Sequence, residues 1–387
     1  MEKRIQVLDI ARGLAIIGTL GTNIWIFSKL GNYDFMLGFG MNDYSLDTIL
    51  ESLVLFLTNG KFLGLLTILF GMGLELKRQS FVKRNQEHIW LWLYIWSMLL
   101  LLADGFLHFL FVFEYDILMS YAVTGIIVAL LVRRKIKLIK ILALILGILH
   151  IAGVLLISFI LEAGMRFPGS QEEFSLALNE IAAVYSTGSY LDQVLFRFDG
   201  IFQMRLEAIA VIPMNILLFL FGVYLVRAGI FRQTKRSEEL RKKFFFWGLV
   251  VGIPLNALVF LPFYSMVTLV RYLFAPLMAV GYLMAIHWIL ERKANHFLLQ
   301  RLSEVGRTAL SCYILQNITA SVLFYSWGFS LGGKLNSVGT IVVFIFITLL
   351  MMIFAHFWLR KYNRGPFEMI WRRLTNAPFA RFMKETA

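Results

Sequence analysis

The chain has 387 residues, of which 59% are hydrophobic and only 16% charged, and its formal net charge is +13. A soluble domain is nearer half apolar and a quarter charged, so this composition excludes an ordinary soluble protein. It predicts a protein that is embedded in a membrane.

Ten apolar stretches follow one another along the chain, and most are long enough to cross a hydrocarbon core of about 30 Å. They are continuous and do not alternate, and backbone amides in lipid must be satisfied within their own segment, so we expect helices. The sequence predicts an all-α, polytopic integral membrane bundle of about ten transmembrane helices, with residues 1–387 forming a single membrane domain. The expected spans are residues 8–28, 60–76, 89–111, 115–132, 138–161, 208–227, 244–263, 268–290, 307–328 and 337–358.

Three segments outside these spans are long enough to have structure of their own. In the outer loop at residues 29–59, the stretch from Asp47 to Thr58 predicts an amphipathic helix on the outer surface, although the second span can also begin within it. The outer loop at residues 162–207 contains a helix-like run around Phe174–Val184, and it either caps a cavity or only connects two spans. Residues 359–387 are expected to form a cytoplasmic tail.

The distribution of Lys and Arg predicts the orientation. The segments assigned to the inner side carry 27 of the 37 basic residues, and those assigned to the outer side carry 5. By the positive-inside rule, both termini are expected in the cytoplasm. The same bias, with attraction to anionic lipid, explains the net charge, so membrane lipids are the expected partners and nucleic acid is not.

Polar side chains at membrane depth are costly unless they are paired or face water, so they are the candidate functional residues. At the inner side, Asp9 and Arg12 are three residues apart on one helix face, and Arg307 lies at a similar depth on another helix. These residues either anchor the helix ends or form a cationic mouth that holds the phosphates of a cytosolic donor such as acyl-CoA.

A second polar group lies nearer the outer side. Asp104 and His108 are four residues apart on one helix, which would let the carboxylate orient the imidazole as a general base. The alternative is that both residues pair with cations and only lock helices together. The other members of this group, at similar depth, are Asn23, Lys61, Asp116, Arg271 and Gln316.

Metal and cofactor signals are absent from the sequence. No two histidines share a helix face at metal-ligand spacing, and no phosphate-binding or dinucleotide fingerprint is present. We therefore expect no metal site and no tightly bound cofactor, and acyl-CoA enters only as a donor substrate.

Four stretches resemble the YeiB-like family of bacterial membrane proteins, catalogued as domain of unknown function 418. They are RIQVLDIARGLAIIGTLGTN at residues 4–23, GKFLGLLTILFGMG at 60–73, HFLFVFEYDILMSYAVTG at 108–125, and the C-terminal pair GRTALSCYILQN at 306–317 with RKYNRGPFEMIWRRLT at 360–375. The resemblance implies a multi-pass protein of the bacterial inner membrane.

The opening LDIARG is also similar to the heparan glucosaminide N-acetyltransferase group, within a broader superfamily of transmembrane acyltransferases. This resemblance implies acyl transfer from a cytosolic donor to an acceptor at the far face, with Asp9, Arg12 and Asn23 at the reaction channel. That group has a histidine soon after the first helix, whereas this sequence has none between Asn23 and Lys61. His108 would then have to replace it.

Three functions remain open from the sequence. In an acyltransferase, Arg12 and Arg307 would bind the donor, His108 would act as the base, and Lys61 or Arg271 would stabilise the oxyanion. In a transporter of a small amphipathic solute, the same polar groups would form a solute or proton path. A catalytically silent scaffold or lipid-binding protein is the third function.

Overall fold

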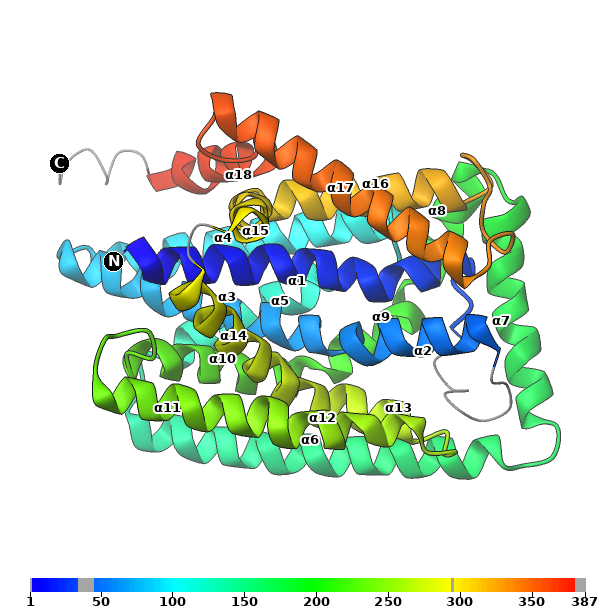
Figure 1. The fold of residues 1–387 in the computed structure, drawn as a ribbon, viewed down its shortest axis with the longest axis horizontal. Helices are drawn as coiled ribbons and strands as arrows, with labels where there is room; N and C mark the ends of the chain where they lie inside the picture. The colour runs from blue at the N-terminus through cyan, green and yellow to red at the C-terminus, as the bar shows by residue number, and fades with distance from the viewer. Residues whose placement is uncertain (1, 34–44, 294–295, 380–387) are drawn as a thin grey trace.

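The computed structural model describes residues 2–33, 45–293 and 296–379, and every secondary-structure element in these ranges is helical. Most of the long helices run along the long axis of the molecule (Figure 1). The helices longer than six residues are α1 (Glu2–Ser28), α2 (Leu46–Thr58), α3 (Lys61–Lys83), α4 (Glu87–Phe111), α5 (Leu118–Leu131), α6 (Ile136–Met165), α7 (Ser170–Thr187), α8 (Tyr190–Asp199), α9 (Ile201–Ala210), α10 (Ile212–Arg227), α11 (Lys235–Phe245), α14 (Ala275–Arg292), α15 (Phe297–Arg307), α16 (Ala309–Phe324), α17 (Ser337–Lys361) and α18 (Pro366–Asn376).

Two of the long apolar helices contain irregular stretches. The π-helical turn η2 (Phe246–Val251) joins α11 to α12 (Gly252–Ala257), which ends in the 3₁₀ turn η3 (Leu258–Phe260). A second π-helical turn, η4 (Val270–Phe274), lies between α13 (Met266–Leu269) and α14. A last 3₁₀ turn, η5 (Ala377–Phe379), follows α18.

The described residues contain seven helices that are long and apolar enough to cross a membrane, and the pair α9 and α10, bent by 41°, would make an eighth. The two remaining predicted spans coincide with the shorter apolar helices α5 and α16. The prediction of a polytopic α-helical membrane protein is therefore confirmed. The count of ten stays a prediction.

Helix α1 lies inside the bundle, between α3 and α16 in the view of Figure 1, and it packs against both. Its closest neighbour is α15, which crosses it. A Cβ atom on Gly13 would lie 1.9 Å from the carbonyl oxygen of Leu302, and one on Gly306 would lie 1.7 Å from that of Asp9. Only glycine at both positions permits this approach, which brings Arg12 and Arg307 to one end of the bundle.

The predicted amphipathic helix is present as α2, but it does not lie across the end of the bundle. It continues the direction of α3, alongside α1 (Figure 1), so that residues 46–83 qualify together as one long membrane helix. The break falls at Gly60, whose φ of +77° lies in the left-handed region that favours glycine.

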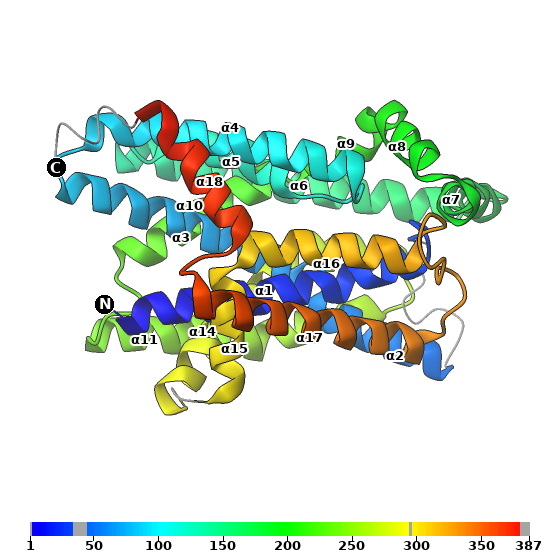
Figure 2. The same cartoon turned by 90° about the horizontal axis from the view of Figure 1, so that it is seen from above.

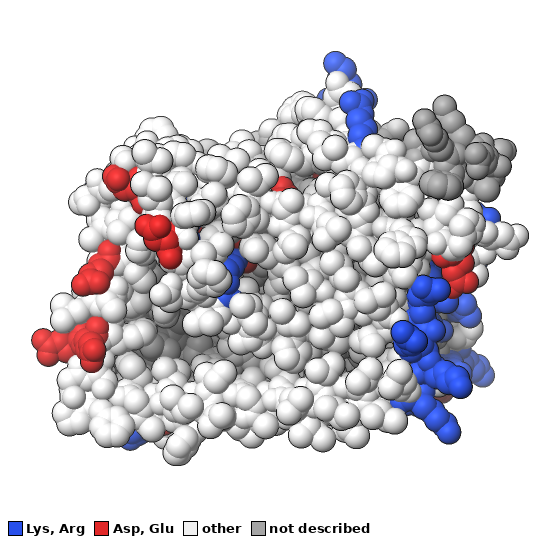
Figure 3. Space-filling model, turned by 180° about the vertical axis from the view of Figure 1, so that it is seen from behind, with Lys and Arg blue, Asp and Glu red and all other residues white. Residues whose placement is uncertain are grey.

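Lys and Arg side chains gather at one end of the molecule, and Asp and Glu gather at the other (Figure 3). We call them the basic end, where α3 ends at Lys83 and α17 at Lys361, and the acidic end, where α7 crosses the bundle (Figure 2). This separation agrees with the alternation of basic loops in the sequence.

The long loop that follows α6 forms a helical cap at the acidic end. The predicted run Phe174–Val184 lies within α7. Helix α8 fastens the cap to the end of α4, because Arg197 Nε donates to the carbonyl oxygen of Leu110 at 2.9 Å and the Tyr190 hydroxyl donates to that of Phe111, also at 2.9 Å. Both contacts fall within one turn of His108.

Candidate functional site

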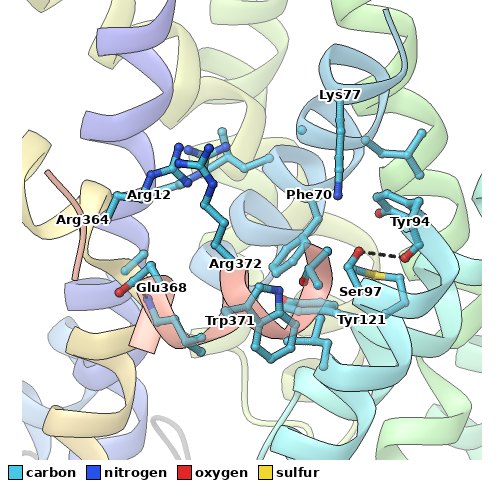
Figure 4. Close-up of a pocket in the computed structure, with 18 of the residues that line it drawn as sticks. Arg12, Phe70, Lys77, Tyr94, Ser97, Tyr121, Arg364, Glu368, Trp371 and Arg372 are labelled. Carbon is cyan, nitrogen blue, oxygen red and sulfur yellow. Dashed lines mark hydrogen bonds between the residues drawn. The ribbon is translucent and has the colours of Figure 1, made fainter. Parts of the chain in front are cut away.

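A cavity of about 860 Å³ opens at the basic end between α1, α3, α4, α16 and α18. Its rim carries more cations than anions, and three of the arginines, Arg12, Arg364 and Arg372, converge in Figure 4 while Lys77 faces them from α3. The basic lining residues are Arg12, Lys77, Arg84, Arg307, Arg364 and Arg372, and the acidic ones are Asp9 and Glu368.

Most of these cations lack a carboxylate partner. Arg12 pairs with Asp9 at 3.2 Å, and Arg307 donates to the carbonyl oxygen of Asn363. The other four make no ion pair with any described residue. A cluster of unpaired guanidinium groups is a favourable site for phosphate, which they can bind through two parallel hydrogen bonds.

Behind this rim the cavity becomes apolar. Along α3 its lining extends from Phe81 to Leu66, which is about 22 Å at the helical rise of 1.5 Å per residue. The deeper walls are formed by Ile16, Leu66, Leu69, Phe70, Leu93, Met98, Leu101 and Leu118. The cavity therefore suits a ligand with a phosphorylated head and an apolar tail.

Helix α18 forms one side of the mouth and is fastened to α16. The Glu368 carboxylate accepts from the backbone N–H of Leu310 at 2.7 Å and of Ser311 at 3.1 Å, and it also accepts from the Ser311 hydroxyl. These are the orphan amides at the start of α16, where a negative charge is favourable. On the other side, Trp96 Nε1 donates to the carbonyl oxygen of Leu374.

The deep end of the cavity meets a buried polar cluster. The Tyr313 hydroxyl donates to Asp116 Oδ2 at 2.9 Å, and Asp116 Oδ1 accepts from the N–H of Leu118 at 2.9 Å. On its other side the Tyr313 ring packs against His108, with 5.0 Å between ring centroids. His108 Nε2 in turn lies 2.9 Å from Asn317 Nδ2.

Three helices that line the cavity continue beyond its deep end toward the acidic end. On α4, His108 follows the lining residue Leu101 by two turns, and on α16, Asn317 follows Tyr313 by one turn. On α1, Asn23 follows Ile16 by two turns. Asn23, His108 and Asn317 thus continue the same helix faces that line the cavity, beyond its deep end.

The predicted pair of Asp104 and His108 does not form. His108 is 5% exposed and bonds to Asn317 on α16, whereas Asp104 Oδ2 has no hydrogen-bond partner among the described residues. Two residues at i and i+4 share a helix face, but no hydrogen bond joins Asp104 to His108 among the described residues. Asn317 holds the ring instead.

The predicted cations of the outer group lie elsewhere. Lys61 and Arg271 line a separate cavity of about 10 Å³, which His108 does not line. Arg271 Nη2 pairs with Glu207 Oε1 at 2.7 Å, so it does not lock Asp104 or His108. Gln316 is fully buried on α16, and neither of its amide atoms is hydrogen-bonded within the part of the chain that the structure describes.

The sequence predicted that Arg12 and Arg307 lie at one cationic mouth, and both residues line the large cavity. It missed Tyr313 and Asn317, whose spacing of four residues on an apolar helix was the available signal. It also missed Arg364, Glu368 and Arg372, because a basic segment after the last span resembles an ordinary cytoplasmic tail.

At the acidic end, Glu114 and Arg197 form a buried ion pair with 3.9 Å between Oε2 and Nη1. Burial raises the pKa of the Glu114 carboxyl above its usual value of 4.5, and the positive charge of Arg197 opposes this shift. Glu114 lies in the connection between α4 and α5, and Arg197 lies on α8, so the pair joins the α7–α8 cap to that connection next to the buried cluster.

The fold and its cavity define a multi-pass α-helical membrane protein with a cationic mouth and an apolar interior. Residues 225–378 match a family described as "Protein of unknown function (DUF418)". The resemblance to the YeiB-like family that the four sequence stretches predict is thereby confirmed.

Curated relatives extend this likeness over the whole chain. An uncharacterized protein YxaH of Bacillus subtilis is 27% identical over 100% of this chain and 97% of its own length. The uncharacterized protein YeiB of Escherichia coli is 25% identical over 97% of each chain. An uncharacterized 39.9 kDa protein of Bacillus acidopullulyticus is 25% identical over 100% of this chain and 98% of its own.

Proposed function

We propose that this protein transfers an acyl group from a cytosolic acyl thioester that carries phosphates, such as acyl-CoA, to a hydroxyl or amine of an envelope or lipid acceptor. The supporting observation is the cavity of about 860 Å³, with its cationic rim, its apolar interior, and its deep end against Tyr313, Asp116 and His108. In this proposal the basic end faces the cytosol of a bacterial inner membrane.

The rim binds the head of the donor. The guanidinium groups of Arg364 and Arg372, with Arg12, Arg307 and Lys77, hold its phosphates, while the acyl end enters the apolar part of the cavity. The acceptor comes from the side of the acidic end, beneath the α7–α8 cap. The thioester carbonyl must then reach the neighbourhood of His108.

The His108 imidazole removes the proton of the acceptor hydroxyl or amine as that atom attacks the thioester carbonyl carbon. The tetrahedral intermediate collapses, the carbon–sulfur bond breaks, and the thiolate takes up the proton from the imidazolium. Asn317 holds the ring during this step. Because the Tyr313 ring packs between His108 and the cavity, it has to turn aside before the reacting atoms can meet.

The first arm of the test measures binding of CoA and acetyl-CoA to the purified protein in nanodiscs. Arg372→Glu should weaken binding about 10- to 100-fold, because a charge-assisted hydrogen bond is worth about 1.5–3 kcal/mol. Arg373→Glu is the matched control: Arg373 is the adjacent residue of α18 and does not line the cavity, so affinity should remain at the wild-type value.

The second arm measures transfer of labelled acetyl groups from acetyl-CoA to membrane material in vesicles that contain the protein. His108→Ala should retain CoA binding and lose transfer by about 10²- to 10⁴-fold, which is the usual contribution of a general base. Wild-type transfer in this variant would remove His108 from the reaction. Absence of CoA binding by the wild-type protein would refute the proposal as a whole.

Transport of a small amphipathic solute is the second candidate, and the irregular helices favour it. The turns η2 and η4 interrupt two membrane helices, and α9 and α10 meet at 41°. Interrupted helices line the solute path of many transporters. Uptake of a labelled fatty acid into protein-containing vesicles without any acyl donor, unaffected by His108→Ala, would support transport over acyl transfer.

A further inference from the structure

The side chain of Lys61 is buried at the start of α3, with 1% of its surface exposed. It makes no hydrogen bond and no ion pair with any described residue. Its ammonium group lies over the ring of Phe56, with 5.5 Å between Nζ and the ring centroid. An ammonium group in apolar surroundings without a counter-charge is strongly unfavourable, so Lys61 at this position either is uncharged or has an anion beside it.

A small cavity lies beside this lysine. It measures about 10 Å³, which is close to the space that a single water-sized sphere requires. Its polar lining comes from Asn59, Lys61 and Arg271, and the rest is apolar: Leu55, Phe56, Val259, Val267 and Val270. A polyatomic anion such as phosphate, sulfate or a carboxylate is too large for this space.

The backbone adds to the positive potential there. Helix α3 has 23 residues, and its N-cap, Gly60, offers no side-chain hydrogen bond to the first amides. Those amides and the helix dipole favour negative charge at this end. Asn59 Oδ1 is buried without a described partner, and rotation of this amide exchanges its oxygen for an NH₂ donor. Asn59 can hydrogen-bond to a water as well as to an anion, so only the charge of Lys61 favours an anion in this cavity.

We propose that Lys61 binds a single monatomic anion, chloride under cellular conditions, between α2, α3 and the π-helical turn η4. A neutral water would fill the same space but would leave the ammonium charge without a partner. This site is separate from the proposed acyl transfer, because the cavity beside Lys61 shares no lining residue with the large one. The anion would fasten the break between α2 and α3 to the neighbouring η4.

The test compares thermal unfolding of the purified protein in sodium chloride, sodium bromide and sodium gluconate at equal ionic strength. The Tm of the wild-type protein should rise with chloride or bromide and follow a saturable binding curve, and it should not rise with gluconate. Lys61→Met keeps the length of the side chain and removes its charge. This variant should be at least as stable as the wild type in gluconate and should show no response to halide.

Two further variants test the same site without replacing Lys61, in case the Lys61→Met protein does not fold. Val267→Leu fills the small cavity while Lys61 remains, and it should abolish the halide response. Lys334→Met removes an exposed lysine in the loop between α16 and α17, which does not line the small cavity, and should leave the response unchanged. Equal Tm values of the wild type in chloride and gluconate, or a halide response that survives in Lys61→Met or Val267→Leu, would overturn the proposal.

Discussion

Replacing Gly306 by alanine should push α15 away from α1. The new Cβ atom would lie 1.7 Å from the carbonyl oxygen of Asp9, 2.6 Å from its carbonyl carbon and 2.9 Å from the N–H nitrogen of Gly13. All three are backbone atoms, which cannot rotate out of the way as a flexible side chain can. The two helices must therefore separate.

The size of this effect follows from the contact distances. An ordinary van der Waals contact of a Cβ atom lies at 3.4–4 Å, so the helices have to move apart by about 1.7 Å at their crossing. Overpacking of a close-packed site costs about 1–3 kcal/mol, and a clash between backbones lies at the upper end of this range. The higher helix propensity of alanine offsets up to about 1 kcal/mol of this cost. We expect a net loss of about 2 kcal/mol.

Thermal unfolding in detergent measures this loss, with Gly147→Ala as the matched control. Gly147 lies within α6, and a Cβ atom there would have nothing within 4 Å, so this substitution should be neutral or stabilising by up to about 1 kcal/mol. Binding of CoA gives a second measurement, because Arg307 and Arg12 adjoin the two glycines of the crossing. A Gly306→Ala protein as stable as Gly147→Ala would refute the packing of α1 on α15.

Three other substitutions test the two ends of the molecule. A carboxyl group with a raised pKa stabilises the fold fully below its ordinary value of 4.5, and this contribution is lost as the pH rises through the raised value. As the pH is raised above 4.5, the Tm of the Glu114→Gln variant should therefore fall less than the Tm of the wild type. Parallel profiles of Tm against pH would contradict this. Arg197→Met should cost about 3–5 kcal/mol because it leaves Glu114 buried without its partner, and the double variant with Glu114→Gln should recover most of it in a thermal-unfolding cycle. Glu368→Ala should cost about 1–3 kcal/mol and speed hydrogen exchange in residues 366–376, whereas exchange at the wild-type rate would show that α18 is held by other contacts.

The positions of the helices along the chain could be predicted from the sequence, because the length and continuity of an apolar run determine whether it can cross a membrane. Each of the ten predicted ranges overlaps a long or short apolar helix. The direction of α2 could not be predicted. Asp47 and Glu51 indicated a helix lying on the outer surface, but Lys29 Nζ lies 2.8 Å from Glu51 Oε1 and Ser337 N–H donates to Asp47 Oδ1, and these contacts hold α2 along the side of the bundle.

The candidate site could be predicted only in part, and the reason is geometrical. Position along a membrane helix indicates depth, so Lys61, Arg271 and His108 were assigned to one level. Depth does not indicate which neighbouring helix a side chain faces. The structure separates these residues around the bundle, and Asn317 lies next to His108 where Asp104 was expected.

The fastening of α18 beside the cavity has a practical consequence for work with tagged protein. A reporter fused directly after α18 would lie next to the cavity mouth, because this helix supplies Arg372 and Trp371 to the lining. Such a fusion can obstruct an incoming ligand while leaving expression and targeting normal. A tag inserted in the turn between α6 and α7, at the acidic end, would leave the mouth of the cavity free, so measurements of ligand binding on the tagged protein would represent the untagged protein better.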